Sequence, residues 1–379
     1  MGKNIFIISG EASGDLHGAE LIKALARVDP GMSACGMGGE KMRRAGLSGL
    51  DSKEVSVVGI TEVIGKSHHI IKAYAALKRL LRSRKFDAAV LIDFPDFNLH
   101  FAKVLKKAGV PIIYYISPQV WAWRKGRIKT IAGLVKKMLV VFPFEEEIYK
   151  KAGVDALYVG HPLVDMAKCE LTRPEARKKF NLPDSKIAVA LLPGSRTTEV
   201  KRMLGVMLAS ARLIDSAMRA PAVYLIPAVG TLDDAFLDGF LKDCGVDARV
   251  VRGNMYAALR AVDAAVVTSG TATLETALIG APMVITYKLS CLTHLIAKTL
   301  VGIENIGLPN IVAGRLIVKE LIQNEASPEN IADEVVNILK DPVRKDDIIK
   351  GYNDVRKALA PSGKKAADMA AEEILKLTL

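Results

Sequence analysis

Short apolar runs alternate along the chain with longer stretches in which apolar and polar positions repeat at helical spacing. The predicted strands cover residues 5–9, 88–92, 111–116, 138–142, 187–192, 223–226, 264–268 and 283–287. Strands that are almost wholly apolar are typical of parallel sheets that are covered by crossover helices on both faces. The predicted fold class is therefore α/β.

The alternation stops at Gly160-His161-Pro162 and restarts at residue 187. The segment between, residues 163–185, is rich in charge and contains two prolines, so we expect the linker between two domains there. The predicted domains are residues 1–163 and 164–359, and residues 360–379 form a closing helix that crosses back to the first domain. Because ligands of open parallel sheets bind beyond the carboxyl ends of the strands, we expect the active site in the cleft between the domains.

The composition is that of a globular protein without a membrane-spanning segment. Half of the 379 residues are hydrophobic and a quarter are charged. The four cysteines lie far apart without a C-x-x-C pair or a histidine cluster, so a reducing compartment is favoured and no metal site is expected. The most apolar later stretch, residues 289–303, is shorter than the roughly 18 residues that a spanning helix needs. We expect a cytoplasmic protein whose contact with a membrane is peripheral.

The positive charge is concentrated in the first half of the chain. The net charge is +12, and residues 63–144 carry sixteen Lys or Arg against Asp87, Asp93 and Asp96. A basic field of this kind suits nucleic acid, anionic lipid or a phosphorylated substrate. The chain has no helix-turn-helix, RRM or zinc signature, which argues against nucleic acid as a partner.

The first predicted strand runs into the turn Gly10-Glu11-Ala12-Ser13-Gly14-Asp15, which lacks the G-x-G-x-x-G pattern. Acidic side chains stand where a pyrophosphate would lie, so a nicotinamide cofactor is not expected. Asp15 either belongs to the site or complements the helix dipole. Glu11 is the better candidate to face the cleft, and Ser13 is assigned with it to the acceptor or cleft residues.

The strand at residues 88–92 ends in Asp93, with Asp96 and Asn98 before the next helix. Asp96 or Asn98 is explained by a helix N-cap, although Asn98 is also a candidate cleft residue. Asp93 directly ends a buried strand at the edge where ligands gather. A lone carboxylate in that place is the natural general base for a sugar hydroxyl.

In the second domain, two strand-to-helix turns have the residues of an anion site. The first turn contains Gly194, Ser195 and Arg196, and a guanidinium binds phosphate oxygens in bidentate fashion. The second turn contains Ser269, Gly270, Thr271 and Thr273, again at a helix N-terminus. Two such turns in one domain suggest a diphosphate. Glu275 either hydrogen-bonds a ribose or is a first-turn glutamate that favours the helix dipole.

Both tryptophans, Trp121 and Trp123, lie beside Arg124, Lys125 and Arg127. Core packing explains either ring, and the alternative is contact with a lipid headgroup or an acyl-sugar.

A basic segment offers a candidate membrane surface. From residue 66 to residue 86 there are seven Lys or Arg and no acid, and apolar residues from Ile70 to Leu81 share one helical face. That face either packs on the core or, with the preceding loop, docks on an anionic leaflet. The candidate contacts are Ile60, Val63, Ile64, Lys66, Lys72, Lys78, Arg79 and Arg82.

Seven segments in order along nearly the whole chain resemble the motifs of the lipid-A-disaccharide synthase family. They are residues 10–15, 93–98, 117–124, 160–162, 192–196, 269–275 and 308–310. The resemblance implies a GT-B fold of two Rossmann-like domains and an inverting glycosyltransferase. It implies transfer of diacylglucosamine from UDP-2,3-diacylglucosamine to 2,3-diacylglucosamine 1-phosphate, which gives UDP and a β-1,6-linked lipid A disaccharide 1-phosphate.

By position, the resemblance assigns the essential aspartate to Asp93, the phosphate-side arginine to Arg196, the ribose-side glutamate to Glu275 and a cleft asparagine to Asn310. No metal or other cofactor is expected, because no ligand set appears. The expected membrane partner is anionic lipid at the inner face of the inner membrane, and association into a homodimer is left open. The alternative activity is that of another UDP-sugar enzyme of the GT-B fold that acts on a membrane glycolipid.

Overall fold

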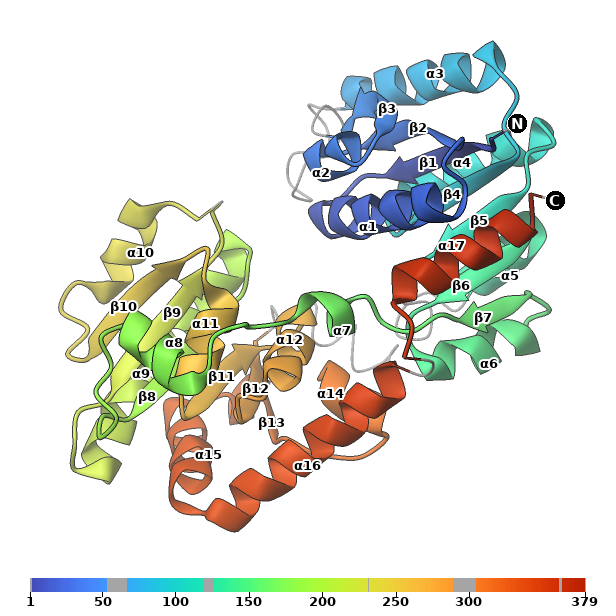
Figure 1. Cartoon of the computed structure of the whole chain (residues 1–379). Helices are drawn as coiled ribbons and strands as arrows, with labels where there is room; N and C mark the ends of the chain where they lie inside the picture. Colours follow the sequence, from blue (N-terminus) through green and yellow to red (C-terminus); the bar gives the residue numbers. More distant parts are fainter. Residues whose placement is uncertain are drawn as a thin grey trace. The chain divides into compact units, whose positions relative to one another are not determined.

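The computed structural model describes residues 2–52, 67–118, 126–230, 232–288, 305–360 and 363–378. The chain divides into two compact units, Met1–Pro162 with Leu359–Leu379, and Leu163–Ala358. Each unit contains one sheet flanked by helices (Figure 1), and every pairing among the described strands is parallel. The predicted α/β class with two Rossmann-like sheets is confirmed.

The sheet of the first unit has the strand order β3-β2-β1-β4-β5-β6-β7. Its strands are β1 (Asn4–Ser9), β2 (Ser33–Gly38), β3 (Leu47–Asp51), β4 (Ala88–Ile92), β5 (Ile112–Tyr115), β6 (Lys137–Val140) and β7 (Ala156–Tyr158). The helices are α1 (Ala12–Val28), α2 (Glu40–Arg44), α3 (Ser67–Ser83), α4 (Pro95–Lys107), α5 (Arg127–Leu134), α6 (Pro143–Lys151) and α17 (Ala366–Lys376).

Aromatic side chains join β1 to helices α3 and α4. The Phe6 ring of β1 stacks on Phe101 of α4 with centroids 5.9 Å apart, and Tyr74 of α3 meets the Phe101 ring edge-on at 5.3 Å. Leu77 and Leu81 of α3 are buried in the same core cluster. The apolar stripe of α3 therefore packs against the sheet at these positions.

Helix α17 returns the end of the chain to the first unit, where it packs along α1 (Figure 1). Glu373 pairs with Lys137 of β6 at 3.0 Å, and Asp368 pairs with Arg27 at the end of α1. Lys3 Nζ donates to the carbonyl of Thr378 at 2.6 Å. The C-terminal segment is thus an integral part of this unit.

The sheet of the second unit has the strand order β10-β9-β8-β11-β12-β13. Its strands are β8 (Ala188–Leu192), β9 (Val223–Ala228), β10 (Asp247–Arg252), β11 (Ala264–Thr268), β12 (Met283–Tyr287) and β13 (Glu320–Ile322). The helices are α7 (Leu163–Met166), α8 (Arg173–Lys179), α9 (Thr197–Met218), α10 (Asp234–Leu241), α11 (Met255–Ala261), α12 (Thr271–Ile279), α14 (Leu308–Ala313), the 3-10 turn Gln323–Glu325, α15 (Pro328–Lys340) and α16 (Pro342–Leu359).

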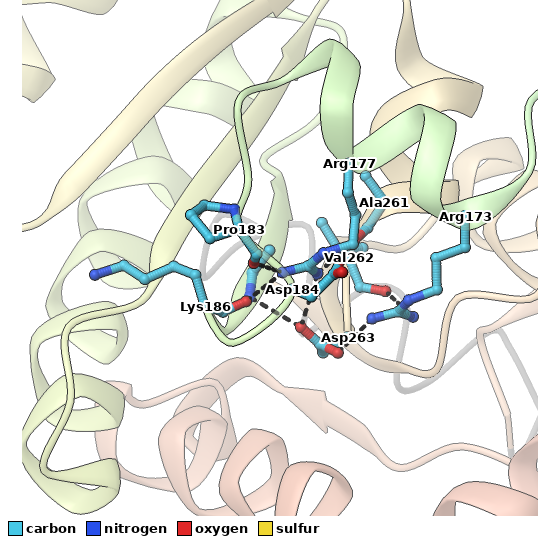
Figure 2. Close-up of polar contacts among 9 residues, drawn as sticks. Arg173, Arg177, Pro183, Asp184, Lys186, Ala261, Val262 and Asp263 are labelled. Atoms are coloured by element: carbon cyan, nitrogen blue, oxygen red, sulfur yellow. Dashed lines mark hydrogen bonds and ion pairs between the residues drawn. The ribbon is translucent and has the colours of Figure 1, made fainter.

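A buried arginine fastens α8 to the amino-terminal edge of this sheet (Figure 2). The guanidinium of Arg177 donates to the carbonyls of Ala261 at 3.0 Å and Pro183 at 2.6 Å, and also to that of Lys186. Its Nη1 lies 3.5 Å from Oδ2 of Asp263, and the same oxygen accepts the Ala188 N–H at 3.0 Å. One side chain therefore joins α8 to the segments that lead into β8 and β11.

All eight predicted strands are present, and the structure adds five that the apolar pattern did not predict: β2, β3, β7, β10 and β13. Strand β2 is buried but rich in Gly, Ser and Ala, and the others lie at or next to sheet edges, are short or carry polar residues. Edge strands lose the continuous apolar signal because one side of them is not covered. Within the described part of the chain, no helix has the length and apolar character needed to cross a membrane.

Candidate active site

In the first unit, two predicted site residues follow neighbouring strands at one edge of the sheet. Strands β1 and β4 pair with Ser9 opposite Ile92 at their ends. The sheet continues to β2 on one side and to β5 on the other, so the strand order reverses between β1 and β4. Ligands of doubly wound sheets bind at such a switch point. Glu11 after β1 and Asp93 after β4 both border it.

The turn after β4 has an unusual backbone. Asp93 and Phe94 have φ angles of +45° and +49°, in the left-handed region. Non-glycine residues pay about 1–2 kcal/mol each in this region and persist there only where their surroundings hold them. The Phe94 ring lies against Gly10, where an added Cβ would stand 2.4 Å from a ring carbon. Only glycine fits at position 10, and the two turns pack directly on each other.

The Asp93 carboxyl is poised to accept a proton near neutral pH. Burial, and after it the negative charge of Glu11, raise the pKa of Asp93 from 3.8 to about 6, against a hydrogen bond from the main chain of Phe94. A base with such a pKa is ionised at pH 7 and is a stronger proton acceptor than an ordinary carboxylate. Glu11 itself is exposed.

The structure corrects the expected capping of α4. Its N-cap is Phe94, and Pro95 occupies the first helical position, so neither Asp96 nor Asn98 is the N-cap. Asp96 forms an ion pair with Arg127. Asn98 is fully buried, and its Nδ2 donates to the carbonyls of Ile92 at 3.2 Å and Asp93 at 2.6 Å. The Asn98 side chain therefore lies beneath the turn that carries Asp93.

The acidic side chains of the turn after β1 differ in their surroundings. Asp15 is buried and accepts the main-chain N–H groups of Lys41 at 3.1 Å and Met42 at 3.0 Å, so its carboxylate binds the first turn of α2. Ser13 is exposed on the first turn of α1. Glu11 and Ser13 are thus the polar side chains of this turn that reach its surface.

His161, in the segment that ends the first unit, is buried and lies 4.9 Å from the Phe142 ring between centroids. Burial, and to a smaller extent His17, lower the pKa of His161 to about 3, so the imidazole is neutral. Its main-chain N–H donates to the carbonyl of Leu359 at 3.0 Å. The observed contacts of this motif residue are with Phe142 and with Leu359, both in the first unit.

In the second unit, the strand order reverses between β8 and β11, and the two predicted anion-binding turns follow these strands. Gly194 has a φ angle of +112°, and an added Cβ would lie 2.5 Å from the carboxylate of Glu199. Glycine is required there by both conformation and space. Two hydrogen bonds hold the turn after β11. Thr273 Oγ1 donates to the carbonyl of Gly270 within the turn at 2.8 Å, and Ser269 Oγ donates to the carbonyl of Ile306, from a later segment, at 3.0 Å.

Arg196 is the N-cap of α9, and its side chain is 70% exposed. The carboxylate of Glu199 accepts the main-chain N–H groups of Ser195 at 3.0 Å and Arg196 at 3.2 Å. The Glu199 carboxylate therefore occupies two of the amides at this turn and also accepts a hydrogen bond from Nη1 of Arg196 at 3.0 Å, while the Arg196 side chain stays largely exposed. The Glu199 carboxylate reaches back to these N–H groups as the glutamate of a capping box does.

Glu275 lies beyond the first turn of α12, so the interpretation that it favours the helix dipole from that turn is wrong. Its Oε1 accepts the hydroxyl of Tyr256 at 2.8 Å, and burial raises the pKa of Glu275. Tyr256 was not predicted as a site residue, because it comes from α11 and only the fold brings it to Glu275.

Asn310 is fully buried in the second unit, with all its polar atoms used. Its Nδ2 donates to Oε1 of Glu320 at 2.7 Å and to the carbonyl of Val318, and its Oδ1 accepts two main-chain N–H groups. Glu320 also accepts the N–H groups of Ile306 at 2.7 Å and Gly307 at 2.9 Å. Asn310 and Glu320 therefore fix the main chain at Ile306 and Gly307, and Ser269 donates to the carbonyl of the same Ile306.

Several predicted contacts lie outside the described residues, namely Trp121, Trp123, Ile60, Val63, Ile64 and Lys66. On α3, Leu77 and Leu81 are buried, whereas Ile70 and Ile71 are 41% and 66% exposed. Lys72, Arg79 and Arg82 are exposed, and Lys78 Nζ lies 5.7 Å from the Tyr74 ring centroid. Helix α3 thus packs on the core through Leu77 and Leu81. Near its start, Ile70 and Ile71 are exposed to solvent next to the exposed Lys72.

The described residues include no group of three or more His, Cys, Asp or Glu side chains arranged to hold a metal ion. The candidate chemical groups are the partly buried carboxylate of Asp93 in the first unit and Arg196 with the N-termini of α9 and α12 in the second.

The comparisons with known proteins agree on one family. The family described as lipid-A-disaccharide synthetase matches residues 5–374. The lipid-A-disaccharide synthase of Syntrophus aciditrophicus is 46% identical over 100% of this chain and 98% of its own length. That of Geobacter metallireducens is 47% identical over 95% of this chain and 94% of its own length. The resemblance read from the motifs is confirmed.

Solved structures share the fold at low sequence identity. The UDP-GlcNAc 2-epimerase of Neisseria meningitidis, bound to UDP-GlcNAc, aligns with a TM-score of 0.65 and 10% identity over 98% of this chain and 99% of its own. A glycosyltransferase of Rickettsia africae aligns with a TM-score of 0.60 and 11% identity over 100% of this chain and 98% of its own. Together with the two parallel sheets, these similarities identify the GT-B fold.

Proposed function

Because this chain belongs to the lipid-A-disaccharide synthase family, we propose that it joins two acylated glucosamine units. The donor is UDP-2,3-diacylglucosamine and the acceptor is 2,3-diacylglucosamine 1-phosphate. The products are UDP and the β-1,6-linked disaccharide 1-phosphate. The chain is thus a glycosyltransferase of lipid A biosynthesis.

The observation that carries the proposal is the Asp93 carboxylate at the switch point of the first unit, with a pKa of about 6. An α-linked donor that gives a β-linkage requires inversion, most simply in one in-line displacement. The acceptor 6'-oxygen forms the bond to the donor C1 as the bond from C1 to the UDP oxygen breaks. Asp93 takes the proton from the 6'-hydroxyl, a contribution of about 10²- to 10⁴-fold in rate.

The second unit holds the UDP group. Arg196 binds the diphosphate, and the turns at Gly194-Ser195 and at Ser269-Gly270 precede the N-termini of α9 and α12. The positive ends of these helices stabilise the charge that develops on the departing UDP. Thr271 and Thr273 belong to the same turn, and Asn310 supports it through Glu320.

Glu275 binds the ribose hydroxyls. Its carboxylate is oriented by Tyr256, and its second oxygen remains available as an acceptor. In the first unit, Glu11 and Ser13 contact the acceptor sugar, and Trp121 and Trp123 are assigned with them to the acceptor residues.

The substrates are lipids, so we propose that the protein binds the inner face of the inner membrane peripherally. Ile71 at the exposed beginning of α3 enters the interface, and Lys72, Arg79 and Arg82 meet anionic headgroups. Each cation near such a surface contributes about 1 kcal/mol. Ile60, Val63, Ile64, Lys66 and Lys78 belong to the same proposed surface.

The experiment is incubation of the protein with UDP-2,3-diacylglucosamine and 2,3-diacylglucosamine 1-phosphate, with mass spectrometry of the lipid products. We expect a tetraacyl disaccharide 1-phosphate and one UDP for each disaccharide, and neither with the Asp93→Asn variant. Release of UDP without disaccharide, or use of a different glycolipid acceptor in its place, would contradict the proposed substrates and favour another UDP-sugar enzyme of this fold.

A further inference from the structure

Two buried side chains converge on one main-chain atom next to the proposed base. The hydroxyl of Tyr114, in β5, donates to the carbonyl oxygen of Asp93 at 2.6 Å. The Nδ2 of Asn98, in α4, donates to the same oxygen at 2.6 Å. Both side chains are fully buried, so bulk water does not replace either bond. Burial raises the pKa of Tyr114 well above its usual value, which keeps the hydroxyl protonated as a donor.

The atom that they hold belongs to the strained turn. Asp93 and Phe94 have φ angles of +45° and +49°, and the Asp93 N–H donates to the carbonyl of Tyr115 at 3.3 Å. A carbonyl oxygen has two lone pairs, and both are used here. The peptide between Asp93 and Phe94 is therefore fixed from β5 on one side and from α4 on the other.

Backbone strain continues at the end of β5. Ile116 has a φ angle of +64°, which is a marked outlier for a β-branched residue. Its N–H donates to the carbonyl of Leu139 at 3.1 Å, so the neighbouring strand β6 holds this residue too. Strain that is held in place by surrounding contacts is typical of functional sites.

We propose that Tyr114 and Asn98 are positioning residues that hold the turn at Asp93 in its left-handed conformation and so aim the Asp93 carboxylate at the acceptor hydroxyl. Neither side chain touches the substrate. The inference rests on the proposed role of Asp93 as the base. A turn that loses one of the two donors relaxes toward ordinary backbone angles, and the carboxylate turns away from the reacting oxygen.

The test begins with Tyr114→Phe, which removes one hydroxyl and keeps the ring in the core. We expect kcat to fall about 10- to 100-fold, since a displacement of about 1 Å has consequences of that size. The donor KM should stay unchanged, because UDP is bound by the second unit. Asn98→Ala should lower kcat in the same way.

The matched control is Tyr224→Phe. Tyr224 is also fully buried, and its hydroxyl, like that of Tyr114, is bonded within the core: it lies 2.8 Å from both the carbonyl of Ala211 and Oδ1 of Asp215 in the second unit. We expect a loss of thermal stability comparable to that of Tyr114→Phe and an unchanged kcat. Equal kcat values for Tyr114→Phe and the wild-type protein, or equal losses of kcat in the two tyrosine variants, would overturn the proposal.

A double variant separates this proposal from the one on which it rests. In the Asp93→Asn background, Tyr114→Phe should add no further loss of kcat, because the group that it positions is already absent. An additive loss would show that Tyr114 acts independently of Asp93. If Asp93→Asn alone retains wild-type kcat, the proposed base is wrong, whatever Tyr114→Phe does.

Discussion

Arg196 and Glu199 form an ion pair on the first turn of α9, with Nη1 and Oε1 3.0 Å apart. The glutamate also accepts two main-chain N–H groups of the turn. Glu199 therefore holds both the main chain of the turn and one nitrogen of the Arg196 guanidinium, and a phosphate that binds Arg196 would replace this largely exposed ion pair.

Replacing Arg196 by Ala should weaken use of the UDP donor. A charge-assisted hydrogen bond contributes about 1.5–3 kcal/mol, so we expect a rise of about 10- to 100-fold in the donor KM, with little change in the acceptor KM. Steady-state kinetics with each substrate varied in turn measures both. Arg212→Ala, on the same helix and with an exposed side chain bonded to the carbonyl of Cys244, is the matched control and should change neither.

The activity should depend on pH through Asp93. Its pKa in the protein without substrate is raised to about 6, and only the ionised carboxylate accepts the proton, so kcat/KM for the acceptor should fall tenfold for each pH unit below about 6. The measurement is a pH profile of kcat/KM for the acceptor. A profile that stays flat down to pH 5 would remove Asp93 from the role of base.

The raised pKa of Asp93 also predicts that the Asp93→Asn variant has a larger free energy of unfolding than the wild type. The folded protein binds the proton more tightly than the unfolded chain does, so ionisation of Asp93 lowers the free energy of unfolding as the pH rises from about 4 to about 6. The variant, which stays neutral, should be more stable than the wild type by roughly 1–3 kcal/mol above pH 6 and by nothing below pH 4. Urea unfolding at several pH values tests this, and a variant that is less stable at pH 8 would contradict it.

Arg177→Ala should destabilise the second unit strongly. It leaves three carbonyls and Asp263 without their buried partner (Figure 2), and breaking such a network costs about 3–5 kcal/mol. The neighbouring Arg173 binds Val262 and Asp263 from a more exposed position, so Arg173→Ala should cost less than about 1 kcal/mol. Urea unfolding compares the two variants. Equal losses would mean that the buried position of Arg177 has no special importance.

Binding to anionic vesicles should depend on α3. Replacing Lys72, Arg79 and Arg82 by Glu should weaken binding by about 100-fold or more, and salt should weaken the binding of the wild type, since each cation contributes about 1 kcal/mol. Co-sedimentation with vesicles of phosphatidylglycerol and phosphatidylcholine measures this.

The control for that experiment reverses three lysines of α4, Lys103, Lys106 and Lys107, which are also exposed. The net charge changes by the same amount, so a loss specific to the α3 variant locates the surface. Equal losses in the two variants would mean that overall charge, and not α3, determines the binding.

The sequence by itself determined the class, most of the central strands and the turns that carry the candidate site residues. Strands such as β4 and β11 are apolar throughout because helices cover both faces, and that pattern is visible without a structure. The carboxyl end of each strand then identifies the next few residues as candidates, and Asp93 and Arg196 were selected as candidates in this way. The order of motifs along the chain identified the family.

Only the tertiary structure decided which side chains meet. The charge of Glu11 raises the pKa of Asp93 because the pairing of β1 with β4 brings their two turns together. The residues of the two turns do not reveal that these strands are neighbours. Asn98 and Asn310 have the residue type of ligand-binding side chains, yet each is buried and bonded to the main chain. A buried amide must find partners, and those partners come from segments that only folding brings near. For the same reason Tyr114, from the neighbouring strand, could not be connected with the carbonyl of Asp93 before the fold was known.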